Sequence, residues 1–285
     1  MKTLKIYALA ALPITAALLL AASSINEGKR NQPRIIPKGC VFRTVMGEES
    51  SDSSFIYKTP YAVFTSVDRG LEWIAKAQSD NGGWGAGSHA RQDVMDPHAV
   101  QSDPATTAMV AMALLRSGTT LTKGEYSSQL KSALNYLLKA TEGSPASSYN
   151  ITDQTGTQIQ TKLGANIDVV LTSQFFSNMF DYLDHDDALK ARVKKNLNTC
   201  VAKIQRAQDK DGSMSGAGWA GVLQSSFANN ALESAQAQGA NVDEVALENA
   251  REYQKGNMDT KTGEVKTDRG AGIVLYSVSS SSSLV

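Results

Sequence analysis

Two kinds of helical pattern alternate along this chain, and no segment shows a convincing two-residue apolar alternation of the kind that marks a strand. Segments with apolar residues three and four positions apart predict amphipathic helices over 64–78, 124–140, 187–208 and 242–256. Segments that are apolar nearly all round predict helices buried on most sides, over 105–115, 169–183, 219–237 and from Gly270 onward. The alternation predicts an all-α fold of hairpins stacked around a centre, with an inner and an outer ring of helices.

The first amphipathic segment ends in a motif that recurs with lower fidelity later in the chain. Its members are Arg69, Trp73, Gln78, Gly82 and Trp84. Degenerate copies place positions 136, 203 and 253 where the first copy has its aromatic residue. In such a unit the Gln can bond backbone groups left open at a helix end, the Gly accepts left-handed backbone angles, and the Trp covers the turn. These residues are therefore expected to staple helices together and not to react.

The Arg69–Trp84 unit resembles the QW repeat of squalene-hopene and oxidosqualene cyclases. Protein prenyltransferase β subunits and complement-type thioester domains share the same helical toroid. The resemblance covers about residues 60–275 and implies an (α/α) toroid, or barrel, of inner and outer helices with about four hairpins. With so few hairpins, either the ring is open or the chain is a partial product of a longer gene. Because one fold hosts several functions, the resemblance does not by itself imply terpenoid-cyclase chemistry.

The catalytic motifs of these families are misplaced or missing in this sequence. Asp184-His185-Asp186-Asp187 has the letters of the Asp-x-Asp-Asp proton donor of triterpene cyclases, but it follows an inner helix and precedes an outer one. Carboxylates at that place are expected to cap a helix. Protein prenyltransferases hold zinc with Asp, Cys and His, yet Cys200 has no His after it, and the sequence lacks the Gly-Cys-Gly-Glu-Gln run of thioester domains. The resemblance therefore leaves enzymatic activity open.

A polar loop precedes the first buried helix and holds two of the three histidines. Its candidate site residues are His89, Asp93, Asp96, His98 and Asp103. Imidazole and carboxylate ligands suit zinc or iron, so the first four could converge on a divalent metal. In the predicted architecture the loop faces the mouth of the central cavity. The alternative is a structural loop, in which Asp96 and Asp103, each followed by a proline, form a turn and a helix cap.

Aromatic residues of the later buried helices form a second candidate site. They are Phe175, Phe176, Phe180 and Trp219, which could line an apolar pocket. A packed core is the alternative explanation for the same spacing.

Net charge and the N-terminal segment indicate which partners and which cellular location to expect. Basic and acidic residues number 28 each, which argues against a nucleic-acid partner. Residues 1–24 combine a basic start, an apolar run and small residues, the pattern of a secretory signal peptide, with an uncleaved membrane anchor as the alternative. Residues 25–60 are interpreted as an irregular arm and 61–285 as the toroid domain. Export would place Cys40 and Cys200 in an oxidising compartment, where they either pair or remain two buried thiols.

The sequence thus favours an exported QW-repeat toroid protein, periplasmic or extracellular, that is not a cyclase. It would bind an apolar or isoprenoid small molecule, or a protein partner, in its central cavity, with no cofactor. Membrane contact would come only through an uncleaved N-terminal segment. One alternative is a terpenoid-cyclase-like or metal-assisted enzyme that uses the His89–Asp103 loop. Another is a structural or interaction repeat module.

Overall fold

The computed structural model describes residues 61–216, 221–257, 259 and 261–262, and every regular element in these ranges is a helix. The helices are, in chain order, α4 (Tyr61–Lys76), the 3-10 helix η1 (Pro97–Ala99), α5 (Pro104–Arg116), α6 (Ser127–Gly143), α7 (Gln158–Leu163), α8 (Ile167–Phe180), α9 (Asp187–Arg206), α10 (Gly221–Ala237) and α11 (Glu244–Lys255). The helix predicted from Gly270, like segments 1–24 and 25–60, lies outside the described residues.

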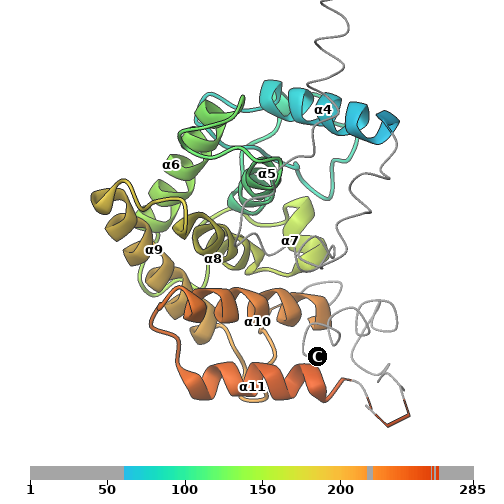
Figure 1. Ribbon diagram of the computed structural model, residues 1–285. Coiled ribbons are helices and arrows are strands. Elements are labelled where there is room, and N and C mark those ends of the chain that lie inside the picture. Colours follow the sequence, from blue (N-terminus) through green and yellow to red (C-terminus); the bar gives the residue numbers. More distant parts are fainter. Residues whose placement is uncertain (1–60, 217–220, 258, 260, 263–285) are drawn as a thin grey trace, which may run out of the picture.

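The buried and the amphipathic helices form two sets that pack on each other (Figure 1). Helix α8 packs against both α5 and α10, so these three buried helices are connected in a row. The amphipathic α6, α9 and α11 pack against α5, α8 and α10 in turn, and α6 also contacts α9. The predicted all-α fold, with buried and amphipathic helices in alternation, is therefore confirmed for the described residues.

Most helices begin and end within a few residues of the predicted positions. Local capping explains where several of them begin. Helix α5 begins as predicted, because the Asp103 carboxylate accepts the Thr106 N–H at 2.7 Å and Pro104 occupies the first helical position. Helix α8 ends at Phe180, earlier than predicted, where the chain turns toward α9. The six-residue α7 was not predicted; Thr157 starts it with a capping box inside a polar segment.

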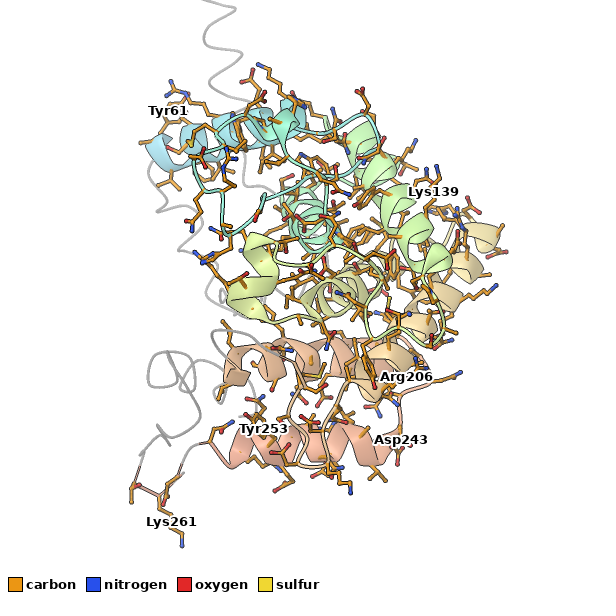
Figure 2. The ribbon with its side chains drawn as sticks, turned by 180° about the vertical axis from the view of Figure 1, so that it is seen from behind. Tyr61, Lys139, Arg206, Asp243, Tyr253 and Lys261 are labelled. Carbon is orange, nitrogen blue, oxygen red and sulfur yellow. The ribbon has the colours of Figure 1, made fainter. Side chains whose placement is uncertain are left out.

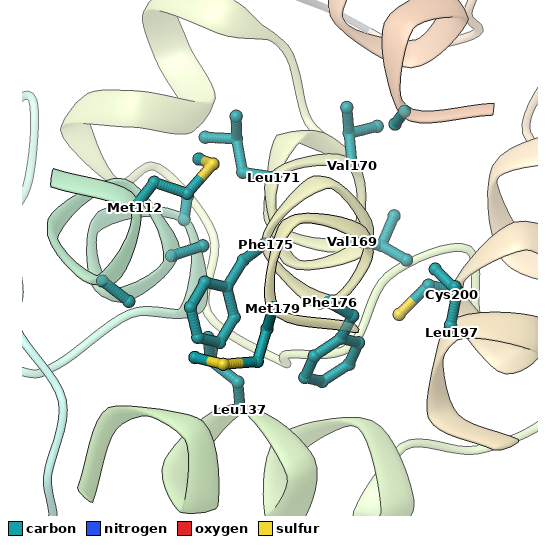
Figure 3. Close-up of a cluster of buried hydrophobic side chains, with 14 of the residues drawn as sticks. Met112, Leu137, Val169, Val170, Leu171, Phe175, Phe176, Met179, Leu197 and Cys200 are labelled. Atoms are coloured by element: carbon teal, nitrogen blue, oxygen red, sulfur yellow. The ribbon is translucent and has the colours of Figure 1, made fainter. Parts of the chain in front are cut away.

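The core is built around α8, which is buried from Ile167 to Met179. Phe175 and Phe176 are both 0% exposed, and their ring centroids lie 6.1 Å apart. Figure 3 shows them with side chains contributed by α5, α6 and α9, among them Met112, Leu137 and Leu197. Apolar and polar side chains of α8 are both buried, so this helix has neighbours on every side and takes the central place in the fold.

The turns that follow α4 and α9 have the same pattern of hydrogen bonds. Gln78 Nε2 donates to the carbonyl of Gly82 at 2.8 Å and to a carbonyl of α6 at 2.9 Å. Gln208 Nε2 donates to the carbonyl of Gly212 at 3.3 Å and to a carbonyl of α11 at 2.9 Å. Both glycines have a positive φ, 89° and 86°. Each glutamine therefore ties the end of one amphipathic helix to another amphipathic helix.

The residue two places after each glycine fastens the turn to a buried helix. The Trp84 N–H donates to a threonine hydroxyl of α5 at 2.9 Å, and the Met214 N–H donates to a serine hydroxyl of α10 at 3.1 Å. The Trp84 ring is buried, and its Nε1 donates to the Ile74 carbonyl at 2.8 Å, so it covers the end of α4. Trp73 and Arg69 are both exposed and do not belong to this staple.

Side chains also join the amphipathic helices directly. The end of α9 lies beside the start of α11, as the labelled Arg206 and Asp243 show in Figure 2, and the Asp243 N–H donates to Gln205 Oε1 at 3.1 Å. Arg192 of α9 holds Glu142 of α6 with two hydrogen bonds of 2.7 and 2.8 Å. These bonds lower the pKa of Glu142 to about 2.

Acid is expected to weaken the contact between α6 and α9 through Glu142. Because its folded-state pKa lies below the ordinary value of 4.5, the stability that it contributes is present above pH 4.5 and is lost as the pH falls toward 2. Glu142→Gln should therefore lower the melting temperature at about pH 6 and have a smaller effect at about pH 2.5. Thermal unfolding of both proteins at the two pH values tests this, and an equal difference at both would contradict it.

Candidate functional site

Two buried carboxylates lie at the first turns of α5 and α8. Asp103 caps α5, and its second oxygen accepts a backbone N–H of the preceding loop at 3.1 Å. Asp168 is fully buried in α8, and its Oδ1 accepts the Ala105 N–H of α5 at 3.1 Å. Its Oδ2 accepts Gln160 Nε2 at 2.8 Å and Asn150 Nδ2 at 3.1 Å. The acid pair therefore fixes the starts of two buried helices to each other and to the loops around them.

Burial raises the pKa of both carboxyls above the ordinary value of 3.8, and the donated hydrogen bonds oppose that shift. At Asp103 the charge of Asp168 raises the pKa further. Since the folded-state pKa of each carboxyl is raised, the stability that its protonated form contributes is fully present below pH 3.8. This stability decreases as the pH rises through the folded-state pKa. The N–H donors are thus what makes the buried carboxylates tolerable at neutral pH.

The backbone carbonyl of Ser102, next to Asp103 of the acid pair, accepts two side-chain hydrogen bonds. The Tyr136 hydroxyl of α6 donates to the Ser102 carbonyl at 2.9 Å, and Gln154 Nε2 donates to the same carbonyl at 2.7 Å. Burial raises the pKa of Tyr136, and the charges of Asp103 and Asp168 add to the shift. Gln154 is therefore anchored next to the acid pair, while it also lines a hollow at the surface.

This hollow, called the loop hollow below, has a volume of about 390 Å³ and lies between the loop before α5 and the loop before α7. Glycines and neutral polar side chains, with one guanidinium, contribute to its lining: Gly87, Ser88, Arg91, Gln101, Gln154 and Thr155. Two of its walls are paired through extended backbone, because Ser88 and Thr157 form an isolated bridge and the Gln158 N–H donates to the Gly87 carbonyl at 2.9 Å. Its size falls within the range of ligand pockets, about 300–1,000 Å³.

The predicted polar residues each have a separate partner. The His89 ring contacts a side-chain amide oxygen of α7 at 2.5 Å, and the His98 ring contacts a backbone carbonyl of α4 at 3.1 Å. Asp93 pairs with Arg91 at 2.9 Å, and Asp96 caps η1. Within the described part of the chain, no group of three or more His, Cys, Asp and Glu side chains is placed to hold a metal ion. The structure thus places Asp96 and Asp103 as the caps of η1 and α5, whereas Asp93 forms an ion pair.

The phenylalanines predicted to line a pocket are packed. Phe175 and Phe176 belong to the core, and they line neither the loop hollow nor the groove described further below. Phe180 is partly buried, with the ammonium groups of Lys190 and Lys194 at 4.9 and 5.3 Å from its ring centroid. These contacts correspond to the packed-core explanation. Trp219 lies outside the described residues.

The cyclase-like motif at 184–187 and Cys200 are also engaged in the structure of the protein. Asp186 accepts a backbone N–H of α9 at 2.9 Å and caps that helix, while Asp184 pairs with Lys190 at 2.5 Å. The motif therefore caps a helix, as its place in the sequence predicts. Cys200 is a free thiol, and its complete burial raises its pKa to about 12, which keeps it protonated and unreactive. Cys40 lies outside the described residues.

Sequence reasoning missed Asp168 and its partners Asn150 and Gln160. The available signal was a carboxylate inside the apolar run Ile167–Leu171, because a buried charge requires donors close by. The sequence does not say where those donors come from. One of them is 18 residues earlier, in a loop whose path depends on the packing of α6 against α5.

The chain matches no family model, no curated protein and no solved structure. None of the helices in the described ranges has the length and apolar character needed to span a bilayer.

Proposed function

We propose that this chain is an exported α/α-toroid protein of the QW-repeat kind that binds an extended segment of a protein partner in the loop hollow. It does not carry out the cyclase reaction of the family that it resembles. The observation that carries this proposal is the loop hollow, an open hollow lined by both polar and apolar groups, whose two loops are joined by the Ser88–Thr157 bridge beside a buried acid pair.

Support for the toroid comes from the pattern of hydrogen bonds that the turns after α4 and α9 have in common. In both turns a glutamine bonds a later amphipathic helix, and a glycine of positive φ lies against that helix. The buried set α5, α8 and α10 then corresponds to inner helices, and the amphipathic set α6, α9 and α11 to outer helices. Repeat architectures are stabilised in this way, since each unit covers its neighbour.

Support for a peptide-like ligand comes from the chemistry of the hollow. Binding residues concentrate on loops that a rigid scaffold holds in place, and the network around Asp168 supplies such a scaffold. Extended protein segments bind by adding backbone hydrogen bonds to exposed extended backbone. The amides and hydroxyls of Gln101, Gln154 and Thr155 are neutral donors and acceptors of the kind that a peptide backbone requires. An apolar ligand on the candidate phenylalanines is less favoured, because Phe175 and Phe176 are packed in the core and Phe180 packs against it.

Peptide selection followed by titration tests this function. Peptides selected from a random library on the wild-type protein are titrated into it and into two variants. Thr155→Trp places an indole at the exposed rim of the loop hollow and should weaken binding at least about tenfold. Thr122→Trp changes another exposed threonine, outside the loop hollow, and should leave the Kd unchanged. A library that yields no binding peptide, or peptides insensitive to Thr155→Trp, would reject the proposal.

A further inference from the structure

A second hollow lies among the amphipathic helices, between α6 and the start of α9, and is called the outer groove below. Its volume is about 450 Å³. Leucines from α6 and from the segments before α6 and around the start of α9 form its apolar lining: Leu121, Leu134, Leu138, Leu183 and Leu189. The first four are buried and Leu189 is half-buried, so the groove has an apolar floor beneath an opening to solvent. Replacing water over such a floor by an apolar chain is favourable.

The charged groups at this groove differ in whether they already have a hydrogen bond or ion pair within the protein. Lys131 and His185 line it and are exposed, and neither has a hydrogen bond or ion pair with any described residue. Arg192 also lines the groove, but its guanidinium is held by Glu142 at 2.7 and 2.8 Å. Asp186, the carboxylate among the lining residues, accepts a backbone N–H as the cap of α9. The side chains at the groove without a hydrogen bond or ion pair are therefore an ammonium and an imidazole, the latter close enough to the Asp184 carboxylate to interact with its charge.

We propose that the outer groove binds a monomeric amphiphilic anion, with its acyl chain on the leucine floor and its carboxylate on Lys131 and His185. A medium-chain carboxylate such as dodecanoate has the required chemistry. Its tail is apolar and flexible, and its two oxygens accept hydrogen bonds from an ammonium and an imidazole N–H. The inference is independent of the proposed function, because it concerns another hollow and another class of ligand.

Titration of the full chain with sodium dodecanoate, below the concentration at which it forms micelles, tests the inference. We expect one molecule bound per chain. Lys131→Met should weaken binding about tenfold or more, because it removes a charge-assisted hydrogen bond. Lys139→Met is the matched control, since Lys139 is exposed on the same helix but lies outside the groove. Thr122→Trp, which fills the rim of the groove, should abolish binding, whereas Thr155→Trp should not change it.

Ligands that differ only in the head group separate the contribution of charge from that of the tail. Dodecylamine should bind at least about tenfold more weakly than dodecanoate, because an ammonium would face Lys131. Equal affinity for the two ligands would overturn the proposal. So would a Kd insensitive to both Lys131→Met and Thr122→Trp, or no binding up to the solubility limit. Cosedimentation with phosphatidylglycerol vesicles without binding of monomeric dodecanoate would overturn it in favour of a membrane surface.

Discussion

Replacing Gly212 by alanine is expected to lower the free energy of unfolding by about 3 kcal/mol or more. The φ of 86° disfavours any side chain, and a Cβ at this position would lie 1.9 Å from the carbonyl oxygen of Asn249 in α11. The clash is with backbone, so it is relieved only by moving the turn away from α11. Gly82→Ala should act in the same way, because its Cβ would lie 2.6 Å from the Ser132 carbonyl oxygen in α6.

Gly156→Ala is the matched control for these two variants. Its φ of 71° is also positive, but a Cβ there meets no atom within 4 Å. The expected loss is about 1 kcal/mol, the cost of the backbone conformation alone. Urea unfolding of the wild type and the three variants measures these differences. Equal losses for Gly156→Ala and Gly212→Ala would show that close contact between the turns and the amphipathic helices contributes nothing.

Asp168→Ala is the second substitution with a large expected effect, a loss of about 3–5 kcal/mol in the free energy of unfolding. The change leaves the Ala105 N–H and the side-chain amides of Gln160 and Asn150 without their buried acceptor. Asp168→Asn should cost less, because one oxygen remains to accept. The starts of α5 and α8 should also exchange their amide hydrogens faster in Asp168→Ala, since the acid holds them together.

Asp153→Ala provides the comparison for Asp168→Ala. Asp153 is an exposed carboxylate in the loop before α7, so its removal should change the free energy of unfolding by no more than about 0.5 kcal/mol. Urea unfolding of both variants at neutral pH gives the difference. If Asp168→Ala were no more destabilising than Asp153→Ala, the acid pair would not be the support of the loop hollow.

The sequence predicts those features that depend on residues close together in the chain. Apolar periodicity locates the helices, and Asp103 followed by Pro104 marks the start of α5, because capping involves only neighbouring residues. The Gln78–Trp84 turn is predicted for the same reason. Its hydrogen bonds recur at Gln208–Met214, although methionine replaces the tryptophan there.

Features that depend on which helices become neighbours are not predicted. Lys203 corresponds in sequence to Trp73, yet Lys203 is 1% exposed and Trp73 is 60% exposed. The ammonium of Lys203 is buried because it donates to the carbonyls of Pro145 and Ser148, in the loop after α6, at 2.6 and 3.0 Å. The partners of Asp168 escape prediction for the same reason. The loop hollow likewise depends on how the loops before α5 and α7 meet, which no local pattern specifies.

Amide hydrogen exchange of the protein, with and without a selected peptide at saturating concentration, tests most directly the claim that the loop hollow binds a partner segment. We expect slower exchange in segments 87–91 and 154–157, which contribute to the lining of the hollow, and unchanged exchange at the outer groove between α6 and α9. Slower exchange only at the outer groove, or at α4 and α11, would contradict it.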